Sequence, residues 1–360
     1  MNLYDKISIL GPSAQYDTCG PKDFFQTTNI PGVYRADLGV GRTCRLFKVL
    51  QTNSCLNNCR YCAFRRDRST ARQTATADDM AKAFYSAFSR RLVEGLFLSS
   101  GLVANPDATM TAMLDTVQIL RRKFAYRGYV HLKIMPGSSR SVIHESAQLA
   151  NRLSLNIESP TESSLALLSP EKNLKIGFYH TLTLIRDELI KLRSQGRHSP
   201  SLTTQFVVGA ADEKDQDLIQ STAFLYKNFG LKRVFFSAFR PVDHTPLADK
   251  PPVPLWREHR LYQADFLLRR YHFSPWDIPL TKGFLSDSAD PKLLWAQSHP
   301  EFFPINLNIA DYWNLLKVPG LGPTSAKKLL RFRRLSRLTS LDQLAHHRFQ
   351  LAKLRQFACV

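Results

Sequence analysis

The sequence predicts an α/β fold in which a parallel sheet curls into a partial or full (β/α) barrel, followed by a small all-α domain. Two observations predict the barrel: strand-like runs alternate with helical stretches from Thr43 onward, and apolar and polar residues alternate along those strands. A third observation predicts the all-α domain, because two helical patterns flank a proline- and glycine-containing turn near the carboxyl terminus.

The chain of 360 residues divides into four expected segments. Residues 1–42 hold several prolines and glycines and are expected to form a loop-rich lead-in. Residues 43–245 form the barrel core, residues 246–305 a connecting region rich in proline and aromatic residues, and residues 306–360 the all-α domain.

Six short strands alternate with longer helices in the predicted core. The expected strands are Cys44–Leu50, Gly95–Ser99, Tyr129–Met135, Ser154–Glu158, Thr203–Gly209 and Arg233–Phe239. The expected helices are Asp78–Val93, Thr109–Ala125, Ser141–Arg152, Thr161–Leu168 with Phe178–Ser194, and Asp215–Phe229. In parallel barrels the chemistry sits at the carboxyl ends of the strands, so the loops that follow the strands are the first place to look for a site.

Cys55, Cys59 and Cys62 directly follow the first expected strand, at the spacing C-x3-C-x2-C. Three thiolates on so short a loop can bind one soft-metal centre, but they leave a four-coordinate or cubane site one ligand short. An iron–sulfur cube held in this way keeps one iron open for an exogenous ligand. The alternative is a structural zinc site, which would want a fourth protein ligand; the nearest downstream candidate, His131, is far along the chain.

Polar side chains occupy alternate positions of the third, fourth and fifth expected strands. Helices cover the outside of a parallel barrel, so the apolar set should face outward and the polar set should line the interior. An ordinary barrel centre favours branched aliphatic residues, and the polar positions are therefore candidate site residues: Lys133, Asn156, Glu158 and Gln205. The alternative is an internal hydrogen-bond network with no function beyond stability.

The charge balance is strongly basic. The chain has 49 Lys and Arg against 30 Asp and Glu, a formal net charge of +19. From Trp313 to Val360 there are ten Lys and Arg and one acid, Asp342. This surplus indicates a polyanionic partner, although a solvated basic surface would show the same composition.

The expected turn near the carboxyl terminus joins a helix that ends at Val318 to one that begins near Thr324. Glycines in such a turn expose backbone N–H groups at a helix amino terminus, where they can bind a phosphate without reading sequence. The candidate phosphate-binding residues are Pro319, Gly320, Gly322, Lys327, Lys328 and Arg331. The alternative is a packing corner between two helices.

The cysteine loop resembles the cluster loop of the radical S-adenosylmethionine superfamily, and Tyr61 matches the aromatic residue usual before the third cysteine. The resemblance implies a [4Fe–4S] cluster on the three cysteines, with S-adenosylmethionine at the open iron and an electron donor such as flavodoxin or ferredoxin. It implies cofactor contacts from Tyr61, Ser99, Ser100, Gly101, Asn156, Glu158 and Gly209. The polar strand faces add Gln205 to the expected cofactor contacts and predict chemistry involving Lys133 and Glu158. The glutamate of the family's Gly-Gly-Glu-like segment is absent from Leu98–Gly101.

The carboxyl-terminal turn resembles the helix–hairpin–helix motif of DNA-binding and repair proteins. With the cluster loop, it makes the whole chain similar to bacterial radical S-adenosylmethionine proteins described as DNA modification or repair proteins. That resemblance implies an enzyme that makes a 5′-deoxyadenosyl radical and modifies or repairs double-stranded DNA. Two alternatives stay open: an RNA-modifying enzyme of the same superfamily, and a non-catalytic iron–sulfur DNA-binding sensor.

The remaining cysteines and the apolar segments complete the sequence-based picture. Cys19, Cys44 and Cys359 are scattered, which is typical of ordinary thiols, although a repair reaction could use Cys19 or Cys359 to return a hydrogen atom. The amino terminus has no signal-peptide pattern, and no apolar segment approaches the length of a membrane span. We expect a cytoplasmic protein that does not act on a membrane.

Overall fold

The computed structural model describes residues 3–17, 30–39, 42–347 and 349–360. Its contacts divide the chain into two compact units. The first unit comprises Met1–Glu213 with Phe224–Glu258, and the second comprises Lys214–Ala223 with His259–Val360. The first therefore takes in the expected lead-in as well as the barrel core. The division falls within a helix near residue 258 rather than at residue 245, and Cys19 lies outside the described residues.

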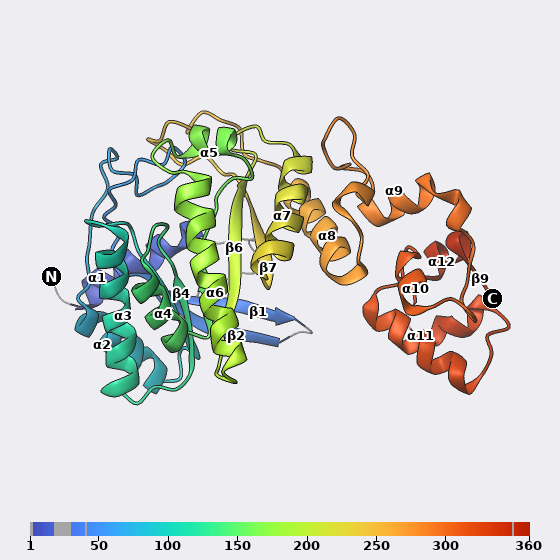
Figure 1. Ribbon diagram of the computed structural model, residues 1–360, viewed down its shortest axis with the longest axis horizontal. Helices are drawn as coiled ribbons and strands as arrows, with labels where there is room; N and C mark the ends of the chain where they lie inside the picture. Colours follow the sequence, from blue (N-terminus) through green and yellow to red (C-terminus); the bar gives the residue numbers. More distant parts are fainter. Residues whose placement is uncertain (1–2, 18–29, 40–41, 348) are drawn as a thin grey trace. The chain divides into compact units, whose positions relative to one another are not determined.

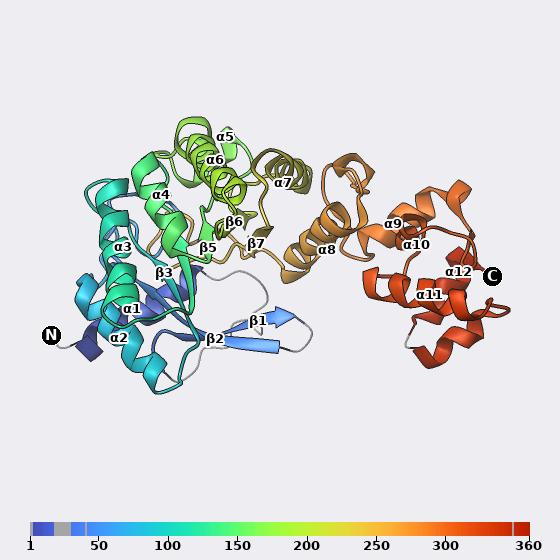
Figure 2. The same ribbon diagram turned by 60° about the horizontal axis from the view of Figure 1, so that its bottom comes forward.

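The first unit is built on a seven-stranded sheet in which the strands follow one another in chain order. The strands are β1 (Val33–Gly39), β2 (Arg42–Leu50), β3 (Gly95–Ser99), β4 (Tyr129–Lys133), β5 (Arg152–Ser154), β6 (Ser201–Val208) and β7 (Arg233–Ala238). β1 pairs with β2 antiparallel, and every later neighbouring pair is parallel. Figures 1 and 2 show the sheet curling as an open half-barrel. The carboxyl ends of β2 to β7 consequently share one edge of the sheet.

Helices cover the outer face of this sheet (Figures 1 and 2). They are α2 (Ala77–Ser89), α3 (Pro106–Arg122), α4 (Arg140–Leu149), α5 (Glu162–Leu168) and α6 (His180–Ser194), with a π-helix, η3 (Leu174–Tyr179), before α6. A further helix, α7 (Asp215–Phe229), is divided between the two units, and only its end from Phe224 onward belongs to the first. Helix α2 packs on α3, α3 on α4 and α4 on α6, which gives a continuous outer layer. The predicted alternation of strands and helices is confirmed.

The apolar set of each strand forms the core between sheet and helices, as predicted. Val130 and Leu132 of β4 and Phe206 of β6 are fully buried, and the Phe206 ring stacks with that of Phe236 on β7 at 6.2 Å between centroids. The other set faces the concave side, where His131 Nε2 lies 2.9 Å from Ser154 Oγ.

Two expectations about segment boundaries were wrong. The described part of the lead-in is not loop-rich: it contains helix α1 (Leu3–Ser13), the 3-10 turn η1 (Ala14–Asp17) and strand β1. Prolines and glycines misled the prediction here, because Pro12 lies inside α1 and not between two elements. The fourth strand begins earlier and is shorter than expected, and residues beyond Ser154 keep only scattered bonds to β6, such as the Glu158 bridge to Phe206.

The second unit is mostly helical. It contains the later part of α8 (Leu255–Tyr271), η4 (Pro275–Asp277), α9 (Pro291–Ser298), η5 (Pro300–Phe302), α10 (Tyr312–Lys317), α11 (Pro323–Leu335), η6 (Leu341–His347) and α12 (Leu351–Phe357). Two short strands, β8 (Ile305–Asn306) and β9 (Ala358–Cys359), pair in parallel and tie the carboxyl terminus to this unit. No helix in the described ranges has the length and apolar character needed to cross a membrane.

Candidate active site

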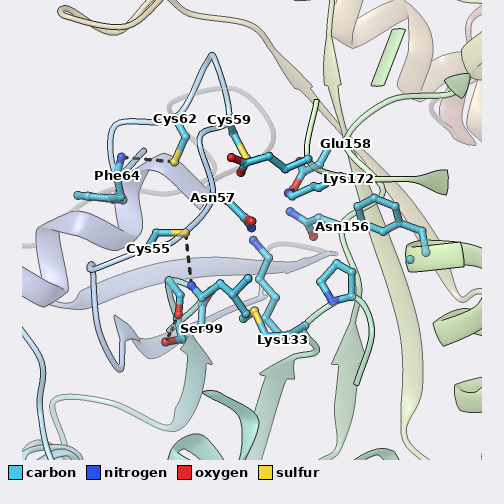
Figure 3. A pocket seen from close by; sticks show the side chains of 18 of the residues that line it. Cys55, Asn57, Cys59, Cys62, Phe64, Ser99, Lys133, Asn156, Glu158 and Lys172 are labelled. Atoms are coloured by element: carbon cyan, nitrogen blue, oxygen red, sulfur yellow. Dashed lines mark hydrogen bonds and ion pairs between the residues drawn. The ribbon is translucent and has the colours of Figure 1, made fainter. Parts of the chain in front are cut away.

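A cavity of about 450 Å³ lies in the first unit and is lined by residues that follow successive strands of the sheet. This volume is in the range of small-molecule and cofactor sites. The cysteine loop follows β2, Ser99–Leu102 end and follow β3, Lys133–Pro136 end and follow β4, and Asn156 and Glu158 follow β5. Figure 3 shows these side chains pointing toward one another. The cavity therefore lies at the carboxyl edge of the sheet, where the sequence analysis expects a site.

All three cysteines of the motif line this cavity. Cys59 is buried and its Sγ lies 3.1 Å from Ser169 Oγ. The Sγ atoms of Cys55 and Cys62 each accept a backbone N–H at 3.4 Å, from Leu102 and Phe64 respectively (Figure 3). Hydrogen bonds to sulfur stabilise thiolates and tune clusters that thiolates bind. The loop thus presents its three sulfurs to one side of the cavity.

The cysteines are not arranged around a single ion. Across the described part of the chain, no group of three or more His, Cys, Asp or Glu side chains is placed to hold one metal ion. A cubane cluster requires no such convergence, because each thiolate binds a different iron atom. A structural zinc site would also require a fourth protein ligand beside the three thiols.

Lys172 supplies a positive charge beside the cysteines. Its Nζ lies 3.7 Å from Glu158 Oε1, and both side chains are largely buried. Burial works against the ammonium form, but the negative charges that Cys59, Glu158, Cys62 and Cys55 carry when they are ionised outweigh it and raise the pKa of Lys172 above its ordinary value. Lys172 therefore stays protonated, and its charge balances the anionic groups around it.

The thiol of Cys62 and the phenol of Tyr61 are both held in their neutral forms in the absence of a bound cation. Burial, followed by the neighbouring Cys59, raises the pKa of Cys62 to about 12 despite the N–H of Phe64 and the charge of Lys172. Burial also raises the pKa of Tyr61, and a hydrogen bond with Glu158 adds to the effect. The thiols must lose their protons when they bind a metal, so cluster binding would be coupled to proton release.

Glu158 occupies an unusual backbone conformation in this wall. Its φ is 71°, in the left-handed region that non-glycine residues seldom adopt. Hydrogen bonds on both sides hold it there: its N–H donates to Gln205 O at 3.0 Å and its carbonyl accepts from Val207 N at 2.8 Å. Such strain clusters at functional sites, and here it accompanies a carboxylate that faces the cavity.

Most of the predicted cofactor-binding residues lie together around the cavity. Those that line it are Tyr61, Ser99, Ser100, Gly101, Lys133, Asn156, Glu158 and Gln205. Gly101 has a clear steric reason to be glycine, because a Cβ there would lie 2.0 Å from the carbonyl oxygen of Ser54 on the cysteine loop. The close approach lets the β3 end run beside that loop, with Leu56 N donating to Leu102 O at 2.8 Å.

Gly209 is not among the residues that line the cavity. Its φ is +79°, and a Cβ at this position would lie 2.3 Å from Val253 Cγ2. Its N–H donates to the carboxylate of Glu213 instead. The structure gives Gly209 a role in the turn after β6, and its contact with a cofactor stays a prediction.

The wall formed by Glu171–Phe178 was not predicted from the sequence. Glu171, Lys172, Asn173, Ile176, Gly177 and Phe178 line the cavity. This segment follows α5 and includes most of η3, where the sequence pattern indicates only a gap within a helical stretch. The signal that could have found it is Ser169-Pro170-Glu171-Lys172, where a proline and adjacent charges interrupt the apolar helical pattern at the edge that holds the site.

The predicted phosphate-binding residues lie together in the second unit. Helices α10 and α11 pack on each other and are joined by residues 318–322, with Gly320 at φ +86° (Figure 1). Pro319 is buried, and a Cβ on Gly320 would lie 3.3 Å from Lys353 Cβ, so this glycine packs against the α12 region. Lys327, Lys328 and Arg331 are exposed on α11.

Comparisons with known proteins give a distant likeness to solved structures. No protein-family model matches the chain, and no curated protein matches it. A radical SAM methyltransferase from Sphaerobacter thermophilus is 16% identical with a TM-score of 0.48, over 72% of this chain and 80% of that one. Methylornithine synthase (PylB) is 14% identical with a TM-score of 0.47, over 61% of this chain and 60% of that one.

A third similar structure is HydG, a maturase of the [FeFe]-hydrogenase. It is 14% identical with a TM-score of 0.46, and the match covers 61% of this chain and 48% of that one. This chain therefore spans about half the length of HydG. Because the identities and TM-scores are this low, the function has to be inferred from the chain's own residues.

Proposed function

We propose that this chain is a radical S-adenosylmethionine enzyme that binds a [4Fe–4S] cluster on Cys55, Cys59 and Cys62 and acts on DNA. One observation carries the proposal: three cysteines at the spacing C-x3-C-x2-C line a single cavity at the carboxyl edge of the sheet. When bound and reduced, such a cluster supplies the electron that cleaves S-adenosylmethionine into methionine and a 5′-deoxyadenosyl radical.

The chain's own residues fit this chemistry. The N–H groups of Leu102 and Phe64 donate to two of the sulfurs, and Lys172 offers a positive charge next to an anionic centre. Lys133, Asn156 and Gln205 bring amine and amide groups to the cavity, where they can orient polar groups of a cofactor or substrate. In this proposal Lys133 and Glu158 touch the reacting molecules.

The ring of Tyr61 offers an apolar surface for the cofactor. It packs against a buried cluster formed by Leu168, Val207, Ala210, Ala211 and Phe239. An aromatic ring fixed in this way can stack with a purine, since base–aromatic stacking stabilises binding by about 1–3 kcal/mol. Tyr61 is accordingly proposed to contact the adenine of S-adenosylmethionine.

The DNA part of the proposal rests on the second unit. Lys327, Lys328 and Arg331 are exposed on the first turns of α11. The first N–H groups of this helix have no intrahelical acceptors, and the amino end of a helix favours anions. Phosphate contacts of this kind hold a nucleic acid without selecting its sequence. We therefore assign phosphate-backbone binding to the α10–α11 turn, and chemistry to the first unit.

An electron donor is also required. The cysteine loop holds five arginines and one acid, Asp67, between residues 51 and 76. Arg66 is 53% exposed, although it also pairs with Asp67 and Glu171. An acidic one-electron carrier such as flavodoxin or ferredoxin suits this surface by charge.

Mass spectrometry of nucleosides is the test of the proposed function. The anaerobically reconstituted protein, with reductant and S-adenosylmethionine, should change the nucleoside composition of double-stranded DNA, whereas the Cys55→Ala/Cys59→Ala/Cys62→Ala variant should not. A change confined to RNA would favour the RNA-modifying alternative. DNA binding with an intact cluster but no cleavage of S-adenosylmethionine would favour the sensor alternative and contradict the proposal.

A further inference from the structure

The cysteine loop is long and has little regular structure. Residues 51–76, between β2 and α2, contain turns, bends and one isolated bridge, from Thr52 to Thr74. Backbone carbonyls in such a segment lack the ladder partners that strands provide, and buried carbonyls need donors from elsewhere. The interactions that fix the shape of this loop therefore determine the positions of its three sulfur atoms.

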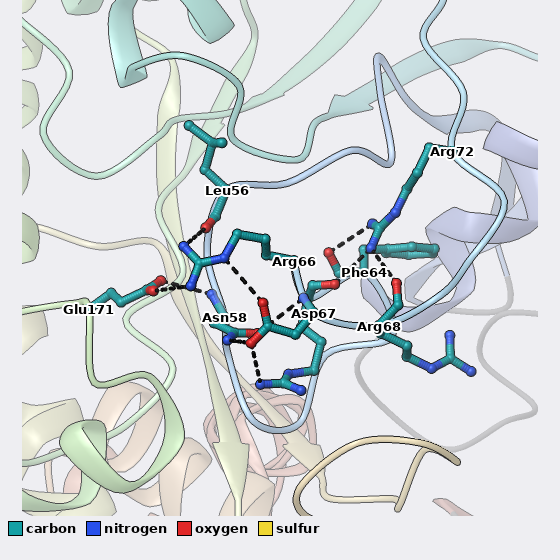
Figure 4. Close-up of polar contacts among 9 residues, drawn as sticks. Leu56, Asn58, Phe64, Arg66, Asp67, Arg68, Arg72 and Glu171 are labelled. Atoms are coloured by element: carbon teal, nitrogen blue, oxygen red, sulfur yellow. Dashed lines mark hydrogen bonds and ion pairs between the residues drawn. The ribbon is translucent and has the colours of Figure 1, made fainter.

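One side chain, Arg72, satisfies four of these carbonyls, and Figure 4 shows its contacts with Phe64 and Arg68. Its Nη1 donates to Asn53 O at 2.6 Å and to Phe64 O at 2.9 Å. Its Nη2 donates to Arg65 O at 2.7 Å and to Arg68 O at 3.0 Å. The planar guanidinium suits this task because its donors point outward in a fixed fork.

The four carbonyls lie on both sides of the cysteines in sequence. Asn53 comes two residues before the first cysteine, and Phe64, Arg65 and Arg68 follow the third. Arg72 therefore joins the two ends of the segment that carries all three cysteines. Adjacent bonds close the base of the loop: Asn53 N donates to Gln73 O at 3.2 Å, and Gln73 N donates to Asn53 Oδ1 at 2.7 Å.

We infer that Arg72 is a positioning residue that holds the cysteine loop in the shape required for cluster binding. The inference rests on the proposed [4Fe–4S] cluster and adds to it a residue outside the cysteine motif. Arg72 acts through the carbonyls of the loop and does not itself ligate iron. Its loss should loosen the geometry of the sulfurs while the sheet and helices stay folded.

The chain contains a matched control for this test. Arg121 is also half-buried in the first unit and also donates to backbone carbonyls, those of Tyr126, Gly128 and Leu149, at 2.8–3.0 Å. Two of these partners lie between α3 and β4 and the third is the last residue of α4, so none belongs to the cysteine loop. Arg72→Met removes four hydrogen bonds to backbone carbonyls and Arg121→Met removes three, but only the first variant removes them from the cysteine segment. Arg72→Lys keeps the charge and loses the fork.

The experiment measures the rate at which a chelator removes iron from the reconstituted proteins, together with the thermal midpoint of each apoprotein. We expect Arg72→Met to release iron roughly tenfold faster than the parent or more, as is typical when a group that orients metal ligands is removed. The rate of iron release from Arg72→Lys should fall between those of the parent and Arg72→Met. Arg121→Met should lower the thermal midpoint at least as much as Arg72→Met does, and should release iron at the parental rate.

A second measurement separates this inference from the cluster assignment. In the apoprotein, the alkylation rate of Cys59, which is 6% exposed, should rise in Arg72→Met and not in Arg121→Met. Faster alkylation with no iron uptake by the parent would overturn the proposed cluster but keep the loop-ordering role. Parental iron release and parental alkylation in Arg72→Met would overturn the inference, as would equal effects from Arg121→Met.

Discussion

The cysteine loop after β2 and the turn between α10 and α11 both carry clustered positive charge, but they use it in opposite ways. In and beside the cysteine loop, two cations point into the protein: Arg72 donates to four backbone carbonyls, and nearby Lys172 lies beside Glu158 and the thiols. On α11, by contrast, Lys327 and Lys328 are exposed. Inward charge shapes a site, whereas exposed charge is available to a polyanionic partner.

The same comparison applies within the second unit. Arg333 donates to the carbonyls of Leu307 and Ala310, and Arg355 forms an ion pair with Asp342 at 2.6 Å. These two arginines contribute to the net charge that the sequence shows, yet their groups already have partners. A charge count therefore overstates the number of cations that can meet phosphates, and the contacts identify which ones are better candidates.

The largest expected effect is the loss of the cluster. Replacing Cys55, Cys59 and Cys62 together by Ala should abolish iron and sulfide binding, because no thiolate of the motif remains. DNA affinity should stay at the parental value if the two regions work separately. Iron and sulfide analysis checks the loss of the cluster, and a DNA-binding isotherm checks the unchanged affinity. Parental iron content in this variant would refute the ligand assignment.

The next effect concerns Glu158. Glu158→Gln keeps the shape of the side chain but removes the charge that faces Lys172. Turnover should fall at least about tenfold, since a hydrogen bond to a charged group is worth roughly 1.5–3 kcal/mol. Glu188→Gln is the control, because Glu188 is also buried but pairs with His144 on the outer helices. Equal turnover in the two variants would remove Glu158 from the site.

A smaller and graded effect is expected on α11. Lys327→Gln/Lys328→Gln/Arg331→Gln should weaken DNA binding and lower the salt dependence by roughly 0.9 for each phosphate that the protein no longer neutralises. Iron content should not change. A control triple on the first unit, Lys191→Gln/Arg193→Gln/Arg197→Gln, removes the same charge from exposed positions at the end of α6. Equal salt slopes for both triples would return the α10–α11 turn to the status of a packing corner.

Lys292 makes the stability of the second unit depend on pH. Burial lowers its pKa to about 7, in spite of Asp290, while its Nζ donates to the carbonyl of Leu321 in the α10–α11 turn. The unfolded chain binds this proton up to a pH near 10.5, so stability should rise between about pH 7 and pH 10.5, by at most about 1.4 kcal/mol per pH unit. Lys292→Met should flatten this rise.

Tryptophan fluorescence during urea unfolding can follow that effect, since Trp276, Trp295 and Trp313 lie in the second unit. An unchanged pH profile in Lys292→Met would show that another group is responsible.

The stability of the first unit should depend on pH in the acid range, and this is the smallest of the expected effects. Burial, assisted by the charges of Arg152, Lys48 and Lys133, lowers the pKa of His131 well below 6.5. The unfolded chain takes up a proton near pH 6.5 while the folded one does not, so stability should fall as the pH drops below 6.5. His131→Asn should reduce this loss, measured by hydrogen exchange of β4 amides. A steeper loss in His131→Asn would contradict the sign.

Much of the fold and part of the site could be predicted because both follow from local pattern. The alternation along β4 predicted that Lys133 faces inward, and the spacing of the cysteines predicted the loop at the sheet edge. The contacts of Lys172 and Arg72 could not be predicted in this way. Their partners are set by tertiary approach: Lys172 reaches Glu158 from another connection, and Arg72 binds carbonyls whose direction depends on the folded loop.

The most direct test of the central claim is the amount of 5′-deoxyadenosine that the reduced, anaerobically reconstituted protein forms from S-adenosylmethionine. The account predicts formation by the parent and by the Lys327→Gln/Lys328→Gln/Arg331→Gln variant, and none by the Cys55→Ala/Cys59→Ala/Cys62→Ala variant. Absence of 5′-deoxyadenosine from the iron-loaded parent, or its formation by the cysteine variant, would contradict the account.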